Sequence, residues 1–381
     1  MKKFIFICLF MLTFLAAVYA QSPAEVIHSQ QHNFILRPIA VGLSRPWGLA
    51  FLPDGGMLLT ERTGSLLLIK NDKRYRVSGL PKAAVIGQGG LLDVALAPDY
   101  SSSSLIYLTF AEEENSLYGT AAARGQLTGT DSSRPKLQNV EIIYRVSPKS
   151  AGGLHFGSRL AFDRQGLLYI SLGERGTMQR AQNPLDPGGS IVRINPNGSI
   201  PPDNPFAPGS SGAGKGAPEV WSYGTRNSQG MAMHPNTGEI WFHEHGPKGG
   251  DEVNIARKGA NFGWPRTTYG INYNGTIISR QTTAPGITPP IIYWVPSIAP
   301  SGLAFYTGSR FKNWQGNAFV GALAGQHLRR LVLQGNTVRH QEVLLKDKIG
   351  RIRDVRTGPD GYIYLLTDAN KGILYRLEPA D

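Results

Sequence analysis

The strongest constraint on the fold is a sequence unit that recurs six times along the chain. Each copy contains a short apolar segment, a turn rich in Pro, Asp or Gly, and a segment of alternating aromatic and aliphatic residues. The copies begin near Trp47, Leu91, Arg159, Gln229, Ser301 and Ile352. Each copy predicts a β-hairpin with one apolar face that it cannot bury alone. The chain is therefore expected to bury these faces by stacking repeats against one another.

Six such units predict an all-β, six-bladed β-propeller, with four-stranded blades around a central channel and only short exposed edges. The prediction treats residues 21–381 as a single propeller domain. The strand expected over 34–41 precedes the first unit, so we expect it to pair with the last blade and close the ring. An open β-sandwich or two stacked β domains is the alternative. The sequence shows no linker and no helical stretch in support of it.

The first twenty residues have the three parts of a secretory signal peptide: basic Lys2 and Lys3, an apolar run over 4–18, and a small-residue site ending at Ala20. We expect 1–20 to be removed and the protein to be periplasmic or secreted. A membrane anchor is the alternative, but the run is short and polar sequence follows, so stable membrane insertion is not expected. Cys8 is the only cysteine, so the mature chain would have no thiol for a disulfide, a metal or a nucleophile.

The formal net charge of +12 could indicate a nucleic acid or a membrane surface as partner. The Lys and Arg residues are scattered, however, and no nucleic-acid motif is present. Nucleic acid is therefore not an expected partner, and the positive charge is assigned to solubility or to attraction of an anionic cofactor or partner.

Polar stretches rich in Gly and Pro interrupt the repeats at 120–135, 183–217 and 267–290. Loops of this length inside a compact domain are usually functional. In a propeller they gather on one face, so they are expected to build the site.

Six motifs, taken in order, resemble the signature set of the soluble glucose and aldose sugar dehydrogenases that use pyrroloquinoline quinone. They lie at 87–92, 155–160, 224–230, 244–252, 261–264 and 351–354. The resemblance runs from about Arg45 to Leu377. It implies a quinoprotein that oxidises aldose sugars at C1 to lactones and passes the electrons to an external acceptor, either a quinone or a small redox protein. No Cys-x-x-Cys-His haem motif is present in the sequence. The sugar, the acceptor and the choice between monomer and homodimer stay open.

The resemblance implies that His155 is the general base, which takes the proton of the anomeric hydroxyl. An imidazole suits this task because it titrates near working pH. Glu174 occupies the position of a carboxylate that orients the histidine. The structural alternative is that His155 is a hydrogen-bonded channel residue without a catalytic role.

Pyrroloquinoline quinone carries three carboxylates and an electrophilic ortho-quinone, so its pocket is expected to contain guanidinium groups. The resemblance assigns the cofactor to Gln88, Arg226, Asn227, Tyr273, Ala324, Gly325, Gln326, Arg351 and Arg353. Arg351 and Arg353 flank Ile352, so on a strand both would point to the same side; an ordinary solvated strand face is the alternative. Ala324 stands where better-known relatives carry a lysine, so one charged contact is missing, and Gln326 or a backbone amide is the expected substitute.

The resemblance also implies calcium, since the candidate ligands are hard oxygens. The carbonyl groups of Gly246 and Pro247 would hold one ion at the quinone oxygens. A second, structural ion would use the side chain of Glu252 and the carbonyl of Phe262, with Asp251 nearby. The alternative for this acidic segment is an ordinary turn.

Two other functions compete. A calcium-dependent propeller hydrolase or lactonase would need acidic and amide side chains converging on calcium, whereas the channel candidates here are mostly Arg, His and Gln. A non-catalytic sugar- or protein-binding propeller is the second alternative, and the retained His155, Arg226 and paired arginines argue against it. A nicotinamide enzyme is excluded because no Gly-x-Gly-x-x-Gly motif follows a predicted strand and no βαβ alternation occurs.

Overall fold

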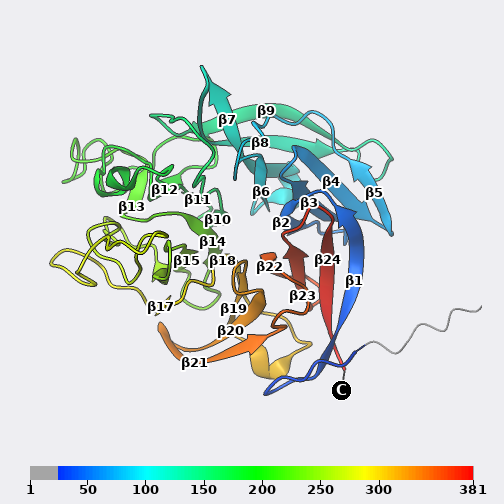
Figure 1. Ribbon diagram of the computed structural model, residues 1–381. Coiled ribbons are helices and arrows are strands. Elements are labelled where there is room, and N and C mark those ends of the chain that lie inside the picture. Colours follow the sequence, from blue (N-terminus) through cyan, green and yellow to red (C-terminus); the bar gives the residue numbers. More distant parts are fainter. Residues whose placement is uncertain (1–24, 381) are drawn as a thin grey trace, which may run out of the picture.

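The computed structural model describes residues 25–380, so the predicted signal peptide at 1–20 lies outside the described residues. Residues 25–380 form six four-stranded antiparallel sheets arranged in a ring (Figure 1). The predicted six-bladed β-propeller is thereby confirmed.

The first three blades follow the chain in order. The first contains β2 (Pro46–Phe51), β3 (Met57–Glu61), β4 (Ser65–Lys70) and β5 (Lys73–Arg76). The second contains β6 (Leu91–Leu96), β7 (Leu105–Glu114), β8 (Leu117–Thr128) and β9 (Lys136–Arg145). The third contains β10 (Leu160–Phe162), β11 (Leu168–Ser171), β12 (Ser190–Ile194) and β13 (Val220–Tyr223).

The remaining blades continue the same pattern. The fourth contains β14 (Ser228–Met233), β15 (Ile240–Glu244), β16 (Asp251–Ile255) and β17 (Ile292–Trp294). The fifth contains β18 (Pro300–Phe305), β19 (Ala318–Ala322), β20 (His327–Gln334) and β21 (Thr337–Leu344). The sixth contains β22 (Ile352–Thr357), β23 (Ile363–Thr367), β24 (Gly372–Pro379) and β1 (Phe34–Leu43). The helical segments α1 (Tyr100–Ser103), η1 (Met178–Gln182) and η2 (Lys312–Trp314) are short.

Each sequence repeat begins at the innermost strand of a blade. Strands β2, β6, β10, β14, β18 and β22 contact one another in turn and surround the axis (Figure 1). Five of them carry an irregularity in their register with the next strand, at or next to the glycine of the repeat in β2, β14 and β18. At Gly48 a Cβ atom would lie 2.6 Å from Oδ1 of Asp93, so glycine lets a carboxylate of the next blade approach the backbone.

The ring closes through the N-terminal strand. β1 pairs antiparallel with β24, from Phe34 opposite Pro379 to Leu43 opposite Gly372, as the sequence predicted. One sheet therefore contains both ends of the described chain, and the blade cannot form until both are in place.

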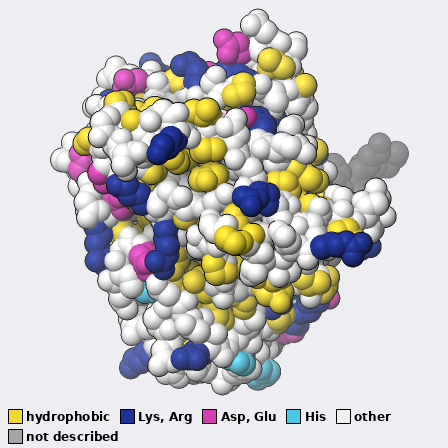
Figure 2. All heavy atoms as spheres, turned by 90° about the vertical axis from the view of Figure 1, so that its left-hand side faces the viewer, with side chains coloured by type: hydrophobic (Ala, Val, Ile, Leu, Met, Phe, Trp, Pro, Cys, Tyr) yellow, Lys and Arg dark blue, Asp and Glu magenta, His cyan; other side chains and the backbone are white. Residues whose placement is uncertain are grey.

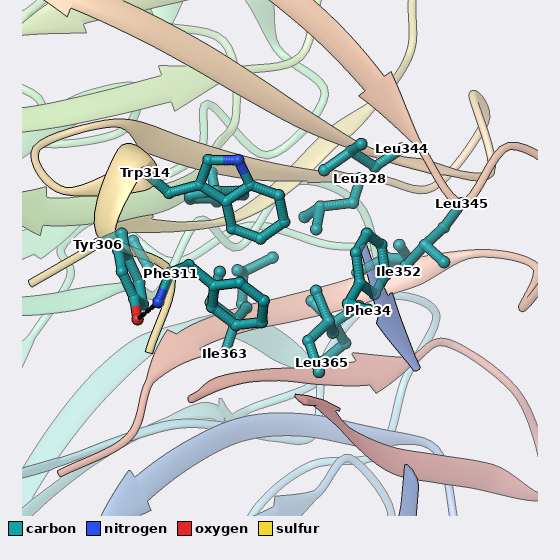
Figure 3. Packing of buried hydrophobic residues seen from close by; sticks show 14 of the residues in the cluster. Phe34, Tyr306, Phe311, Trp314, Leu328, Leu344, Leu345, Ile352, Ile363 and Leu365 are labelled. Atoms are coloured by element: carbon teal, nitrogen blue, oxygen red, sulfur yellow. Dashed lines mark hydrogen bonds between the residues drawn. The ribbon is translucent and has the colours of Figure 1, made fainter. Parts of the chain in front are cut away.

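The core lies between neighbouring blades, and the contact between the fifth and sixth blades illustrates it (Figure 3). Phe34 of β1 packs there with Phe311, Trp314 and Ile352, all fully buried. The rings of Phe311 and Trp314 stack with centroids 4.5 Å apart. Burial of each such side chain contributes about 1.5–3 kcal/mol, so the closing strand also completes a hydrophobic cluster.

Because successive strands of a blade run in opposite directions, alternate loops lie on the same face of the propeller. In each blade the turn between the second and third strands, and the connection to the next blade, lie at the same end. This end is called the site face below. The long loop between β16 and β17 reaches it as well, because Ile271 bridges to Lys248 in the turn between β15 and β16.

Two of the three predicted loops require correction. Residues 120–128 belong to strand β8, and β12 lies within 183–217, whereas 267–290 contains no strand. The first stretch was mistaken because Thr120 and the following alanines give a weak strand signal. These small side chains are nevertheless buried between blades.

Basic side chains do not form one cluster on the side of the molecule shown in Figure 2; they are separated by apolar, polar and acidic side chains. Within residues 25–380, no helix has the length and apolar character needed to cross a bilayer.

Candidate active site

A cavity of about 320 Å³ opens among the strands and loops of the site face. It brings together four of the predicted cofactor residues, Gln88, Asn227, Arg351 and Arg353. The complete lining is Trp47, Arg62, Gln88, Leu92, Phe156, Gly157, Asn227, Gln229, His245, Ala299, Leu323, Arg351, Arg353 and Asp368. Because strands and connecting loops from around the whole ring contribute, the cavity is a product of ring closure.

Asp368, which the sequence reasoning missed, joins the two predicted arginines. Its Oδ2 accepts hydrogen bonds from Nε and Nη2 of Arg351 at 3.0 and 2.9 Å, and its Oδ1 lies 3.2 Å from Nη2 of Arg353. Burial alone would raise the pKa of Asp368, but Arg353 and Arg351 together lower it to about 2. Asp368 directly follows β23, at the end of a strand on the site face, which is the one sequence signal that could have revealed it.

The cavity keeps an excess of positive charge. Arg62, Arg351 and Arg353 line it with only one carboxylate, that of Asp368. Arg353 also donates from Nη1 to Oε1 of Gln229 at 3.0 Å, but its buried Nε has no hydrogen-bond partner among residues 25–380. Burial lowers the pKa of Arg353. A buried, partly unsatisfied guanidinium is costly unless an anion completes its contacts, so the donor set fits an anionic ligand.

His155 and Glu174 are in direct contact. Nδ1 of His155 lies 2.5 Å from Oε2 of Glu174, and the same oxygen accepts the backbone N–H of Gly176 at 2.9 Å. The backbone N–H of His155 donates to Oε1 of Gln88 at 2.9 Å. A Cβ atom at Gly173 would lie 2.1 Å from the carbonyl oxygen of His155, so glycine is required for this close approach. The predicted base and its orienting carboxylate therefore lie together.

His155 borders the cavity rather than lining it. The following residues, Phe156 and Gly157, and its hydrogen-bond partner Gln88 are lining residues, whereas His155 and Glu174 are not. Nε2 of His155 has no hydrogen bond within the described part of the chain. With Nδ1 engaged by Glu174, Nε2 is the ring nitrogen left for a substrate.

Arg226 is buried near the turn between β15 and β16. Its backbone N–H donates to Oε2 of Glu244 at 2.5 Å, and its Nη1 lies 3.2 Å from the carbonyl oxygen of His245 and 3.5 Å from that of Gly246. The ring of Tyr273 is centred 6.0 Å from the Arg226 guanidinium and is 72% exposed. Both predicted residues therefore lie on the site face but outside the 320 Å³ cavity.

The turn over 324–326 also lies beside the cavity rather than in its wall. Ala324 and Gln326 are exposed, while the preceding Leu323 is a lining residue. The carbonyl oxygen of Gly325 accepts a hydrogen bond from Nζ of Lys346 at 2.8 Å. Lys346, on the connection from β21 to β22, thus brings a cation to the turn where Ala324 replaces the expected lysine. The sequence motif could not reveal this, because strands β20 and β21 separate the two segments in sequence.

Two buried glutamates meet at the proposed structural calcium site. Glu244 and Glu252 both line a small cavity of about 10 Å³, together with Gly246 and Phe262. Burial raises the pKa of Glu252 to about 7, and burial and the neighbouring Glu252 raise the pKa of Glu244. Glu244 was missed by sequence reasoning, although it begins the motif at 244–252. Neither carboxylate forms an ion pair within residues 25–380, although the nearby Arg226 partly offsets the rise in the pKa of Glu244.

Asp251 and Pro247 take different positions from this pair. The carboxylate of Asp251 accepts hydrogen bonds from the N–H of Gly246 at 2.9 Å, Oγ of Ser297 at 2.8 Å and the N–H of Ile298 at 2.6 Å. Asp251 therefore joins two loops of the site face. Pro247, which follows Gly246 in the turn between β15 and β16, is buried. Residues 25–380 contain no group of three or more His, Cys, Asp or Glu side chains arranged for a metal, so an ion here would need backbone carbonyl oxygens as well.

Comparison with known proteins identifies the family of this chain. The family model for glucose/sorbosone dehydrogenase matches residues 43–376. Aldose sugar dehydrogenase YliI of Escherichia coli (strain K12) is 45% identical over 343 residues, covering 88% of this chain and 91% of that protein.

Two solved structures extend the comparison. The apo-form of the soluble aldose sugar dehydrogenase from Escherichia coli has a TM-score of 0.86 and 43% identity, covering 91% of this chain and 99% of that one. The PQQ-bound form of aldose sugar dehydrogenase from Streptomyces coelicolor has a TM-score of 0.75 and 28% identity, covering 91% and 98%. This chain belongs to the glucose/sorbosone dehydrogenase family.

Proposed function

We propose that this protein is an aldose sugar dehydrogenase that uses pyrroloquinoline quinone and calcium, oxidises its sugar at C1 to a lactone and passes the electrons to an external acceptor. We place it in the periplasm or outside the cell, after removal of 1–20. The observation that carries the proposal is the arginine-rich cavity beside the His155–Glu174 pair, in a chain of this family.

The cavity residues fit the cofactor. Arg62, Arg351 and Arg353 would pair with its carboxylates, and the amides of Gln88 and Asn227 would add neutral hydrogen bonds. The buried Nε of Arg353 has no hydrogen-bond partner within residues 25–380, and an anion beside this guanidinium would offset the cost of burying its charge. When bound, pyrroloquinoline quinone supplies the acceptor for the hydride of the sugar.

His155 would remove the proton from the anomeric hydroxyl through Nε2, while the C1 hydride leaves the sugar. The sugar thereby loses two electrons and two hydrogens and becomes the lactone. Glu174, 2.5 Å from Nδ1, would hold the ring in one tautomer and stabilise its positive charge. A hydrolase would instead need free carboxylates in the channel, whereas Asp93, Asp354 and Asp368 all lie in ion pairs with arginines.

The first test adds pyrroloquinoline quinone and calcium to purified apo-protein and follows aldose-dependent reduction of an artificial dye. A chelator-treated sample is the control. Turnover that needs both additions is expected. His155→Ala should retain the cofactor, seen by its absorption, and lose about 100- to 10,000-fold in turnover. Absence of both cofactor binding and turnover in the wild type would contradict the proposal.

For calcium, the donors that fit are the carboxylates of Glu252 and Glu244 and the carbonyl of Phe262, with the carbonyls of Gly246 and Pro247 as the second predicted set. Nη1 of Arg226 lies near the Gly246 carbonyl, so a cation bound there would compete with this guanidinium.

Calcium binding should depend on pH, because the ion displaces the proton of a carboxyl group. The pKa of Glu252 is raised to about 7, so affinity measured by calorimetry should fall up to about tenfold per pH unit below pH 7. Glu252→Gln should weaken this dependence, leaving the part due to Glu244, and exposed Glu113→Gln should leave it unchanged. An equal affinity at pH 6 and pH 8 in the wild type would count against Glu252 as a ligand.

A further inference from the structure

We propose that Arg175 is a positioning residue for sugar oxidation: it holds the backbone that presents His155. The inference rests on the proposed function, because it assigns Arg175 a role in placing the predicted base. It does not assign Arg175 any contact with the sugar or the cofactor.

The backbone at His155 needs such support. Its φ angle is 48°, in the left-handed region that residues with a Cβ atom seldom adopt and that costs of order 1–3 kcal/mol. A conformation of this kind persists only where the surroundings hold it. Two contacts hold His155 itself: Oε1 of Gln88 accepts its backbone N–H, and the carboxylate of Glu174 contacts its ring.

Arg175 supplies the contacts on both sides of His155 in sequence. Its Nη2 donates to the carbonyl oxygen of Gly152 at 2.7 Å, and its Nη1 donates to that of Leu154. Its Cζ lies 3.6 Å from the centre of the Phe156 ring. One guanidinium therefore touches the residues immediately before and after His155, including a carbonyl of the peptide bond that joins Leu154 to it.

No acidic partner explains why this cation is buried. Arg175 is 5% exposed, and it has no ion pair within residues 25–380. Its Nε has no hydrogen-bond partner there. Burial and nearby Arg180 together lower the pKa of Arg175 to about 10, although the adjacent Glu174 acts in the opposite direction. A buried arginine that forms no ion pair is an unfavourable way to stabilise a fold, so its hydrogen bonds to backbone carbonyls are the contacts that account for its position.

Arg175 also couples the ring to the backbone. Glu174 and Arg175 are consecutive in the turn after β11, and Arg175 itself has a φ angle of 62°. The carboxylate that contacts the His155 ring and the guanidinium that binds the carbonyl before His155 therefore belong to the same turn, and the position of one depends on the other. Loss of the guanidinium should loosen both.

The test compares Arg175→Met with Arg193→Met. Arg193 is the control, since it is also 5% exposed, lies in the same blade and stacks on Trp221 with Cζ 3.9 Å from the ring centre, but its guanidinium bonds to Asn204 and Asp203 rather than to the backbone around His155. The first readout needs no cofactor. In histidine-labelled apo-protein, NMR detects the ring N–H that His155 donates to Glu174, assigned by its loss in His155→Gln.

Arg175→Met should lose or shift this signal, and Arg193→Met should keep it. The second readout is kinetics after reconstitution. Arg175→Met should lower kcat about 10- to 100-fold, as expected for a small misplacement of a catalytic group, with KM and cofactor affinity changed less than threefold. Arg175→Lys should recover part of both readouts, because an ammonium group can still donate to one carbonyl.

A folded Arg175→Met that keeps the His155 signal and the wild-type kcat would overturn the proposal. If Arg175→Met does not fold, Arg175→Gln replaces it, and an unchanged signal and kcat in that variant would overturn the proposal equally. Absence of turnover in reconstituted wild type would instead be a failure of the proposed function, and the NMR readout on apo-protein would still decide the role of Arg175.

Discussion

Two clusters of arginine and aspartate lie along the propeller axis, and strand β22 supplies residues to both. The axial cluster consists of Asp93, Arg159, Asp354 and Arg356, and the cavity cluster consists of Arg62, Arg351, Arg353 and Asp368. They meet where Nη2 of Arg159 donates to the carbonyl oxygen of Arg353 at 2.9 Å. The same two residue types therefore build two neighbouring regions with different properties.

The axial cluster is balanced. Nη1 of Arg159 lies 3.3 Å from Oδ1 of Asp93 and 3.1 Å from Oδ1 of Asp354, and Arg356 pairs with both aspartates at 3.0 and 2.9 Å. The aspartates also accept the backbone N–H groups of Leu160 and Leu49. These contacts join the first, second, third and sixth blades.

The cavity cluster is unbalanced, with three guanidinium groups and one carboxylate. Arg351 is also half open to solvent, whereas the side chains of Arg159, Asp93 and Asp354 are 1% exposed. In the axial cluster the charged groups pair with one another, so no charged group is left to bind a ligand. In the cavity cluster the guanidinium groups outnumber the carboxylate, so they can bind an anionic ligand. The comparison therefore separates the charges that hold the ring from those available for binding.

The largest expected effect is in the axial cluster. Arg159→Met would leave two buried carboxylates with one partner, so the free energy of unfolding of the apo-protein should fall by about 3–5 kcal/mol. Denaturant unfolding followed by fluorescence measures it, with exposed Arg37→Met as the control. A loss of less than about 1 kcal/mol would contradict this difference between the clusters, because it would mean that the axial cluster does not stabilise the closed ring.

Arg353→Met should weaken cofactor binding, in addition to any loss of stability from its ion pair with Asp368. Loss of charged hydrogen bonds to the cofactor should weaken its affinity by about 1.5–3 kcal/mol, roughly 10- to 100-fold. Arg351→Ala should weaken it less, because that side chain is more exposed. Titration of the apo-protein with the cofactor measures both. Normal affinity in Arg353→Met would show that the surplus charge is not the binding determinant.

Asp368→Asn should reveal a pH-dependent part of stability. The pKa of Asp368 is depressed from 3.8 to about 2 in the folded protein, so its contribution is present above pH 4 and lost as pH falls towards 2. The difference in unfolding free energy between wild type and variant should be up to about 2 kcal/mol at pH 7 and vanish near pH 2. A difference independent of pH would contradict the ion pairs of Asp368 with Arg351 and Arg353.

The smallest effect is expected at the rim of the cavity. Lys346→Met removes an exposed cation that touches the turn over 324–326, so cofactor affinity should fall by no more than about fivefold. Lys348→Met, which removes a neighbouring lysine paired with Glu25, is the matched control. Equal affinities in the two variants would show that Lys346 does not replace the charge missing at Ala324.

The blades were predictable because the hairpins of each blade form between segments that are close in sequence. A hairpin such as β2–β3 is formed within about fifteen residues, and its alternation of apolar side chains follows from strand geometry. The pairing of β1 with β24 was also expected, since a ring of repeats needs a closing strand. The stretch over 120–128 was mistaken for a loop, because Thr and Ala become strand residues only when neighbouring strands bury them.

Site chemistry was predictable only where a motif carried it. His155 and Glu174 were expected together and lie 2.5 Å apart, and Arg351 and Arg353 were expected on one side and line one cavity. Their functional roles stay predictions. Arg62, Asp368, Glu244 and Lys346 were missed, because each is an ordinary charged residue whose significance depends on a partner distant in sequence.

The amino-acid sequence by itself determined the number of blades, the strand that closes the ring and the pair formed by His155 and Glu174, since repeats and motifs are local patterns. Only the tertiary structure decided which charges neutralise one another. Asp354 and Arg353 are adjacent in sequence, yet one joins the axial cluster and the other the cavity. The physical reason is that successive side chains of a strand point in opposite directions, and the closed ring determines what each one meets.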